Sequence, residues 1–501
     1  MKKDFLRNLF VFVLLCLIVI SVKSPTLYTP YFDDAAFWYV PISLLISENN
    51  LNPIFRGIGI PAQMELTSVR KHPWVSSYIS DSSHPVMFYE ILASTYLVFG
   101  YSVFISHFVV LIFAVLTLFF TYLVGKELYS SKTGFIAALL LLFTPIFFSQ
   151  SSRLFPEMAV AAFSLMCFYF AFKEKYYAYL FSGIVLVLLK EQGVFAIISI
   201  IAYIFIKYKN RISKKELFAK IVNYSTPILA LVAWYLFHYL MTGLLITEPS
   251  YNQHSTIQQF INNFAFYFKF IIVDQYRIML TVLVIFFFIK NKKSVFDSRI
   301  ASLMIMFVMY LVFFSWVNLG FLRHILPVVP IFFILVTDKA LLVLKKRLYI
   351  ILFVLLFIGL SISTYHSKTS FNYEENMRYI DVIKAQQEAL IYINEEQNSY
   401  ANSSNVTIWV DLYTYLNFAY PYVGYVNESI TNINLIPIKY LKFEDANTVF
   451  KNNFEKGDLV LETSLYTTEI RSDYQIIKIL NISLIKEIRV NNDFVKIYKV
   501  A

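Results

Sequence analysis

Cysteine, glycine and charged residues are all scarce in this chain. Of its 501 residues, 2 are cysteine, 12 are glycine and 15% are charged. Both cysteines, Cys16 and Cys167, lie inside apolar blocks, which excludes a disulfide framework and a cysteine-based metal site. The sequence also lacks tandem repeats and low-complexity tracts, so repeat architectures are excluded as well.

What the chain has in excess is apolar sequence. Hydrophobic residues make up 58% of it, against about 45–50% in ordinary soluble domains. They are concentrated in blocks of roughly 15–25 residues that carry almost no charge, as expected for helices that cross a bilayer. The composition therefore predicts an α-helical, polytopic membrane protein.

The first apolar run, Asn8–Val22, follows basic residues but is not followed by a small-residue cleavage site, so we interpret it as a span and not as a signal peptide. Ten further spans bring the predicted total to about eleven. They cover residues 102–124, 134–150, 157–173, 175–189, 192–207, 221–241, 264–290, 299–317, 324–343 and 348–365.

Positive charge in the short loops predicts the orientation. With the N-terminus in the cytoplasm, every cytoplasmic loop is basic, as the positive-inside rule requires. These loops are Gly125–Thr133, Lys173–Lys175, Lys207–Lys220, Lys290–Arg299 and Lys345–Arg347. Membrane orientation thus explains the net charge of +10, and nucleic-acid binding is not expected.

Two apolar segments, Ala35–Ser47 and Val86–Phe99, are shorter than the roughly 20 residues needed to cross. We expect both to lie in the plane of the membrane interface. If Val86–Phe99 crossed, every later loop would change sides, and the basic loop Lys207–Lys220 would face outward.

The sequence divides into a membrane domain, residues 1–365, and an extracytoplasmic domain, residues 366–501. In the second part, Asn372–Gln397 has a helical pattern. Four segments have strand features, which predicts a small α/β domain. They are Val406–Val410, Asp458–Leu461, Ile476–Ile488 and Asp493–Val500.

Carboxylates at the outer face of the membrane indicate a structural or functional role, because placing a charge near the apolar phase is costly. Asp33 and Asp34 follow the first span directly, and Glu157 opens a later one. Asp34 would serve as an N-cap for the helix at Ala35, and Glu157 would suit a helix N-terminus. Alternatively, one carboxylate of an adjacent pair has a raised pKa and acts as a base.

Cations and histidines also occur on the outer side, against the positive-inside trend. Lys190 would snorkel and pair with Glu191, and Arg323 would be an interfacial arginine. Alternatively, such cations hold a phosphate and stabilise its charge as it leaves. Together with the carboxylates, this set suits transfer of a group from a lipid phosphate. The remaining members are His84, Arg153, Lys269 and His324.

The order of these motifs resembles that of the type C membrane glycosyltransferases, especially the protein O-mannosyltransferases and the bacterial aminoarabinose transferases that modify lipid A. The matching elements are an acidic pair after the first span, in-plane helices, a second acidic residue, a lysine and an arginine before Leu-Pro. In this chain they are Asp33-Asp34, His84-Pro85-Val86, Glu157, Leu188-Leu189-Lys190-Glu191-Gln192-Gly193 and Phe321-Leu322-Arg323-His324-Ile325-Leu326-Pro327. Two positions depart from the family pattern, since the pair is Asp-Asp instead of Asp-Glu and Val86 replaces a second proline.

The resemblance implies an inverting glycosyltransferase that uses a polyprenyl-phosphate-linked sugar and a protein, lipid or glycan acceptor. Asp33 would activate the acceptor hydroxyl, while Asp34 and Glu157 would shape the site. Lys190, Arg323 and His84 would bind the donor phosphate. Arg153, Lys269 and His324 would contact substrate, and no metal or other cofactor is expected because no tight ligand cluster occurs.

Two other classes stay open from the sequence. A lipid-linked-sugar flippase or transporter would also carry charges in its membrane part, although such proteins tend to have internal repeats and midplane charges. A non-catalytic assembly protein would use its exported domain to bind a partner. Low glycine with abundant lysine, asparagine and isoleucine is typical of AT-rich prokaryotic genomes, which indicates the plasma membrane.

Overall fold

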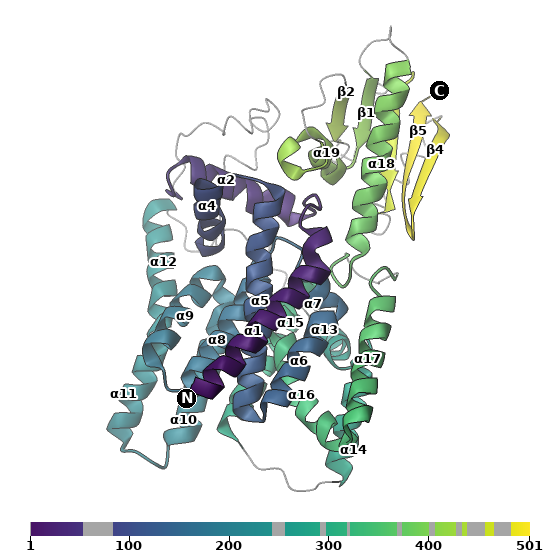
Figure 1. The fold of residues 1–501 in the computed structure, drawn as a ribbon. Coiled ribbons are helices and arrows are strands. Elements are labelled where there is room, and N and C mark those ends of the chain that lie inside the picture. Colours follow the sequence, from purple (N-terminus) through teal and green to yellow (C-terminus); the bar gives the residue numbers. More distant parts are fainter. Residues whose placement is uncertain are drawn as a thin grey trace.

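In the computed structural model, most of the described helices form one bundle, and a small sheet with helices of its own lies beyond one end of the bundle (Figure 1). The residues described are 2–53, 84–242, 256–290, 297–317, 321–367, 373–399, 406–426, 433–437, 456–464 and 482–500. The sequence-based prediction of a helical membrane part followed by a smaller part with strands is confirmed in outline.

The helices of the bundle follow the predicted apolar blocks. They are α1 (Lys2–Lys23), α5 (Val103–Leu128), α6 (Ser131–Phe143), α7 (Pro145–Gln150), α8 (Glu157–Phe172), α9 (Tyr176–Leu189), α10 (Val194–Tyr208), α11 (Lys214–Ser225), α12 (Pro227–Thr242), α13 (Ile257–Ile272), α14 (Ile278–Lys290), α15 (Ser298–Val317), α16 (Val329–Leu344) and α17 (Arg347–Ser363), with short 3₁₀ turns η1 (Ser24–Thr26), η5 (Glu191–Gly193) and η7 (Leu322–Val328).

Five helical stretches within the described residues are long and apolar enough to cross a membrane, or six if α11 and α12 form one span bent by 48°. Shorter apolar helices account for other predicted spans, among them α6, α8, α9, α14 and α17. The chain is thus a multi-pass membrane protein, and the total of about eleven spans stays a prediction.

Besides the bend between α11 and α12, two further predicted spans are broken, and both of these breaks have local causes. Residues 134–150 divide into α6 and α7 because Pro145 begins a new helix after Thr144, whose backbone is extended. Residues 264–290 were predicted as one helix, and this was wrong: α13 ends at Ile272 and α14 starts at Ile278. Gln275 and Tyr276 between them have positive φ angles of 52° and 62°, which no α-helix accommodates.

Helices α5 and α6 approach each other closely through glycine. A Cβ on Gly134 would lie 2.2 Å from the carbonyl oxygen of Tyr122, and a Cβ on Gly125 would lie 2.7 Å from the Cα of Gly134. Backbone-to-backbone contact of this kind needs the missing side chain, since neither helix backbone yields. This contact fixes the close approach of α5 and α6 next to the turn that joins them.

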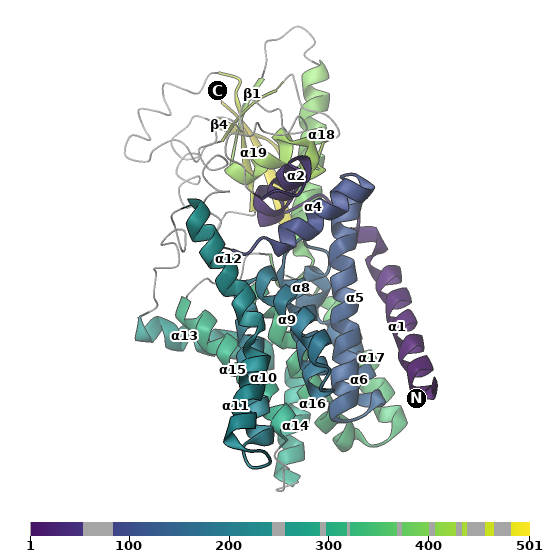
Figure 2. The same cartoon turned by 90° about the vertical axis from the view of Figure 1, so that its left-hand side faces the viewer.

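The two segments predicted to lie in the interface are helical. Ala35–Tyr39 forms a π-helical turn, η2, which continues into α2 (Val40–Glu48), and Met87–Phe99 forms α4. Helices α2 and α4 pack against each other at the end of the bundle that carries the sheet, as Figures 1 and 2 both show. The chain therefore covers this end with short helices before the long helix α5 begins.

In the part of the C-terminal region that the structure describes, five strands form one sheet in the order β2-β1-β3-β5-β4. The elements are α18 (Arg378–Ser399), β1 (Val406–Val410), α19 (Leu412–Ala419), η8 (Pro421–Val423), β2 (Ile433–Pro437), β3 (Leu459–Thr463), β4 (Ile482–Val490) and β5 (Asp493–Val500). Strand β1 runs parallel to β2 and β3, whereas β5 is antiparallel to β3 and β4. The predicted α/β character is confirmed, although β2 and α19 were missed and residues 373–377 of the predicted helix are not helical. Asn372 of that helix and residues 476–481 of the predicted strand lie outside the described residues.

The C-terminal part is bonded to the bundle end through backbone and side-chain contacts. The Tyr31 N–H donates to the Val423 carbonyl at 2.9 Å, and the Tyr422 hydroxyl donates to the Ala36 carbonyl at 3.0 Å. The Tyr101 hydroxyl also donates to the Tyr422 carbonyl. These bonds place η8 directly on the segment that carries Asp33 and Asp34.

Candidate functional site

A buried cluster of charged side chains lies at the end of the bundle nearest the sheet. It unites residues from five separate segments: the α1–η2 connection, the α7–α8 connection, the first turn of α8, the α9–η5 connection and η7. The cluster contains seven of the nine predicted site residues. They are Asp33, Asp34, Arg153, Glu157, Lys190, Arg323 and His324.

Arg323 is the centre of the cluster. Its Nη2 donates to Asp34 Oδ2 at 2.5 Å and its Nη1 contacts Asp33 Oδ2 at 3.4 Å. The guanidinium also lies over the rings of Phe155 and Phe321, 4.4 and 4.6 Å from their centroids. Since the side chain is 5% exposed, these carboxylates and aromatic rings replace nearly all of its water.

Asp33 has the strained backbone and the loosest contacts of the acidic pair. Its φ is +61°, a left-handed conformation that Asp and Asn adopt more readily than most residues. Its Oδ2 receives both Arg153 and Arg323 at 3.4 Å, and its side chain is 21% exposed. The Oδ1 atom has no hydrogen-bond partner among the described residues, so Asp33 retains an oxygen that is able to accept a proton.

Asp34 was weighed as an N-cap for the helix at Ala35. Its side chain makes no capping hydrogen bond and instead pairs with Arg323. Loss of hydration raises the pKa of the Asp34 carboxyl, while the Arg323 charge partly opposes this rise. The carboxylate thus serves the charged cluster and not the helix end.

Glu157, Lys190 and His324 form the second half of the cluster. Lys190 Nζ donates to Glu157 Oε1 at 2.6 Å, and His324 Nδ1 lies 2.9 Å from the same oxygen. The alternative in which Lys190 pairs with Glu191 does not hold, because Glu191 accepts from His84 at 3.0 Å. His324 also stacks on Phe314 with a centroid distance of 5.2 Å and an angle of 8°, which fixes its ring plane.

His84 and Lys269 lie outside this set of contacts. His84 reaches Glu191, the residue after Lys190, and so borders the cluster. Lys269 has a side chain that is 68% exposed and pairs with Asp274 at 3.8 Å on the connection between α13 and α14. Among the described residues, no hydrogen bond or ion pair joins Lys269 to the cluster.

One residue of the cluster was missed by the sequence analysis. Glu374 precedes α18, and its Oε1 accepts from Arg323 Nη1 at 2.7 Å while its Oε2 accepts from the Arg323 N–H at 3.1 Å. Its neighbours are fixed as well: Arg153 donates to the Tyr373 carbonyl and Gln150 to the Glu374 carbonyl, both at 3.1 Å. The only available signal was the acidic pair Glu374-Glu375 just after the last predicted span.

Burial makes Glu374 an unusual carboxylate. Its side chain is 1% exposed, and this desolvation raises the pKa of the Glu374 carboxyl, with Arg323 and Arg153 opposing the rise. Counting Asp33, Asp34, Glu157 and Glu374 against Arg153, Lys190 and Arg323, ionised carboxylates outnumber cations by one. This excess of negative charge favours protonation of one carboxylate, or displacement of one carboxylate from its cation by another anion.

Several polar atoms in the cluster lack partners. Among the described residues, Arg153 Nε, Arg323 Nε and Glu157 Oε2 are buried and make no hydrogen bond. A buried donor without an acceptor costs about 1–3 kcal/mol, and more for a charged group. Unsatisfied buried polar atoms are rare in proteins, and several in one place favour a catalytic or binding role. Among the same residues, no group of three or more His, Cys, Asp and Glu side chains is arranged to hold a metal ion.

Comparisons with known proteins point to one class. A family model described as dolichyl-phosphate-mannose-protein mannosyltransferase matches residues 83–236. No curated protein matches the chain. Together with the structural likeness below, the family match confirms the resemblance to the type C membrane glycosyltransferases that the motifs indicated.

Among solved structures, the chain is similar to ArnT, an aminoarabinose transferase, from Cupriavidus metallidurans. The apo crystal structure of ArnT aligns with a TM-score of 0.54 and 12% identity over 98% of this chain and 97% of ArnT. The structure of ArnT bound to undecaprenyl phosphate gives the same score and identity, with 98% of each chain covered. At this identity the likeness establishes a shared fold, from the first helix through the C-terminal sheet.

Proposed function

We propose that this protein is an inverting glycosyltransferase that moves a sugar from a polyprenyl-phosphate donor to a protein, lipid or glycan acceptor at the outer face of the plasma membrane. The observation that carries the proposal is the buried contact of Arg323 with Asp33 and Asp34, next to the Lys190–Glu157 pair. It unites a potential base and potential phosphate ligands at one membrane level. The match to a mannosyltransferase model and the fold shared with a protein crystallised with undecaprenyl phosphate support this reading.

In the proposed reaction, Asp33 is the base. Its partly exposed Oδ1 would take the proton of the acceptor hydroxyl, whose oxygen then attacks the anomeric carbon. The bond from that carbon to the phosphate oxygen breaks, and the polyprenyl phosphate leaves with the electron pair. Attack from the face opposite to the leaving group inverts the anomeric centre.

The cations have the complementary task. Arg323 and Lys190 would hold the donor phosphate and stabilise the charge that grows on it as the sugar leaves. The buried Nε atoms of Arg153 and Arg323 offer donors that no described residue satisfies. Glu157 would keep Lys190 in place through their 2.6 Å contact, and Asp34 would do the same for Arg323.

Transfer from radiolabelled polyprenyl-phosphate hexoses and pentoses to a membrane extract tests the proposal directly. Asp33→Asn is a suitable variant, because asparagine tolerates the left-handed backbone at this position. We expect its transfer rate to fall by roughly 10²–10⁴-fold, the range in which general bases contribute. Asp4→Asn, at an exposed carboxylate on α1, is the matched control and should transfer normally.

Full transfer by Asp33→Asn would refute the base assignment. Donor affinity unchanged in Lys190→Ala would refute the phosphate role of that lysine. If no donor supports transfer and intact donor instead crosses the bilayer of proteoliposomes, the protein is a flippase and the proposed reaction is wrong.

A further inference from the structure

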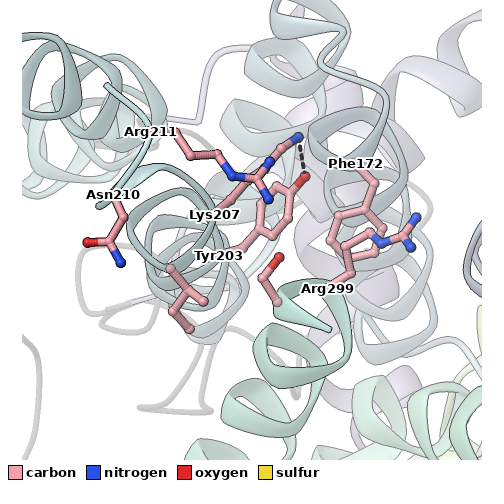
Figure 3. A pocket seen from close by; sticks show the side chains of 8 residues that line it. Phe172, Tyr203, Lys207, Asn210, Arg211 and Arg299 are labelled. Atoms are coloured by element: carbon pink, nitrogen blue, oxygen red, sulfur yellow. Dashed lines mark hydrogen bonds between the residues drawn. The ribbon is translucent and has the colours of Figure 1, made fainter. Parts of the chain in front are cut away.

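A polar hollow lies at the other end of the bundle from the charged cluster. It has a volume of about 500 Å³ and is lined by residues of α10, the turn before α11, α8 and α15. The eight lining residues are Phe172, Tyr203, Ile206, Lys207, Asn210, Arg211, Ser298 and Arg299. Figure 3 shows the cationic side chains Lys207 and Arg211 on the α10 side and Arg299 on the α15 side.

The distance along α10 separates this hollow from the candidate site. Lys190 stands four residues before the start of α10, whereas Lys207 is the last residue but one of that helix. A helix of this length spans about 22 Å at 1.5 Å per residue. The hollow is therefore a different site, and it takes no part in the proposed transfer.

Among the described residues, the lining contains three cations and no carboxylate. Two of the cations have carboxylate partners: Lys207 contacts Glu174 at 2.5 Å, and Arg299 contacts Asp297 at 2.7 Å. The third, Arg211, makes no side-chain hydrogen bond or ion pair among the described residues. Its guanidinium thus offers five unused donors at the mouth of the hollow.

Neutral donors stand next to Arg211. The Tyr203 hydroxyl accepts a hydrogen bond from Lys207 Nζ at 2.9 Å, which leaves its own proton without an acceptor among the described residues. Tyr203 is 1% exposed as a whole, so its hydroxyl belongs to the protein interior and not to the surface. The Asn210 side-chain amide likewise has no partner in the described part of the chain. Each of these groups has an N–H or O–H proton that it can donate.

We infer that this hollow binds a phosphate group, through Arg211 and Lys207 as cations and the Tyr203 hydroxyl and Asn210 amide as neutral donors. Phosphate accepts several hydrogen bonds at once and pairs with arginine through two parallel ones, which fits the cationic and neutral donors that line the hollow. The position at the end of a membrane-spanning helix, beside the basic segment Lys207–Lys220, suits the phosphate of an anionic lipid headgroup. A free phosphate compound presents the same chemistry.

Native mass spectrometry of the purified full-length protein separates these sources. Phosphatidylglycerol is added in one arm, zwitterionic phosphatidylcholine in a second, and inorganic phosphate, with potassium chloride at matched ionic strength as its control, in a third. We expect wild type to retain phosphatidylglycerol or inorganic phosphate at least fivefold more strongly than Arg211→Gln. Binding of the lipid alone assigns a headgroup, and binding of both assigns any accessible phosphate.

Lys214→Gln is the matched control, since Lys214 is an exposed cation on the same segment that does not line the hollow. Tyr203→Phe removes only the hydroxyl and should weaken binding in the same direction as Arg211→Gln. Equal loss in Lys214→Gln and Arg211→Gln would mean general attraction to a basic surface and would overturn the inference. So would retention of phosphatidylcholine equal to that of phosphatidylglycerol, or absence of binding in every arm.

Discussion

Glu374 is the residue whose replacement says most about the candidate site. Its carboxylate accepts hydrogen bonds from the guanidinium and from the backbone N–H of Arg323, at 2.7 and 3.1 Å. If Arg323 binds the donor phosphate, as proposed, then Glu374 competes with that phosphate for the same guanidinium. Glu374→Gln keeps the size of the side chain and an oxygen that accepts a hydrogen bond, but it removes the competing charge.

The expected effect follows from the geometry. A phosphate bound on the free side of the guanidinium would stand about 6 Å from the Glu374 carboxylate, where two like charges repel by about 3 kcal/mol at an effective dielectric constant near 20. Relief of this repulsion corresponds to roughly a hundredfold tighter donor binding. An increase in donor affinity of about tenfold to a hundredfold is therefore expected.

The assay is equilibrium binding of a short-chain polyprenyl phosphate to the purified protein, which does not require turnover. Glu375→Gln is the matched control: it removes a neighbouring carboxylate whose residue contacts Gln275 through its backbone carbonyl and not Arg323. That control should change donor affinity by less than threefold.

Acidity should act in the same direction as the substitution. Burial raises the pKa of the Glu374 carboxyl, so a fall in pH protonates it and removes the same repulsion. Donor affinity of wild type should therefore increase as pH falls, with a smaller increase in Glu374→Gln, where Asp34 and Glu375 still respond. Weaker donor binding by Glu374→Gln would refute the competition and show that Glu374 instead holds Arg323 in place.

Three further predictions concern stability and pairing. Burial and the nearby Asp274 charge raise the pKa of Glu375 to about 7. The free energy of unfolding should therefore fall by about 3 kcal/mol as pH rises from about 4.5 to above 7. Glu375→Gln should lose this pH dependence in thermal unfolding scans. Gly134→Ala should destabilise the protein by about 1–3 kcal/mol or prevent folding, because the added Cβ would clash with a backbone oxygen. Gly359→Ala is the control: its Cβ meets nothing within 4 Å, so the change should be neutral or stabilising. Equal unfolding temperatures of the two variants would contradict the close crossing of α5 and α6. Lys190→Met should destabilise by about 3–5 kcal/mol, because it leaves the buried Glu157 carboxylate without its lysine partner and with only the His324 contact. Adding Glu157→Gln should recover most of the loss, and additive losses in the double variant would argue against a direct pair.

Much of the fold was predictable because the membrane imposes simple rules on sequence. Apolar blocks without charge locate helices, and the spans near residues 102–124, 299–317 and 324–343 correspond to α5, α15 and α16. The break between α13 and α14 was not visible, since Gln275 and Tyr276 have side chains that give no sign of a positive φ. Arg277 closes this break by donating to Gln275 Oε1 at 3.0 Å and to the Phe270 carbonyl, contacts that depend on the bend itself.

The candidate site was predictable as a set of residue types and not as a set of pairs. Charged side chains at the level of the membrane are costly, and this criterion identified Asp33, Asp34, Glu157, Lys190 and Arg323 as candidates. The pairs depend on the three-dimensional packing and not on proximity in sequence, since Lys190 pairs with Glu157 and its neighbour Glu191 contacts His84. Lys269 was included because α13 and α14 were read as one helix, and the bend leaves it exposed beside Asp274.

The position of Glu374 changes how the two parts of the chain relate to each other. A division at residue 365 separates Arg323 from a carboxylate that binds it, and Arg153 from the Tyr373 carbonyl that accepts its hydrogen bond. Tyr373 in turn donates to Ser464 and Asp493, and Arg378 pairs with Asp493 at 2.6 Å, so the sheet holds this segment from the other side. Any ligand that displaces Glu374 from Arg323 must therefore pull on the C-terminal part, which makes that part a component of the site rather than a separate appendage.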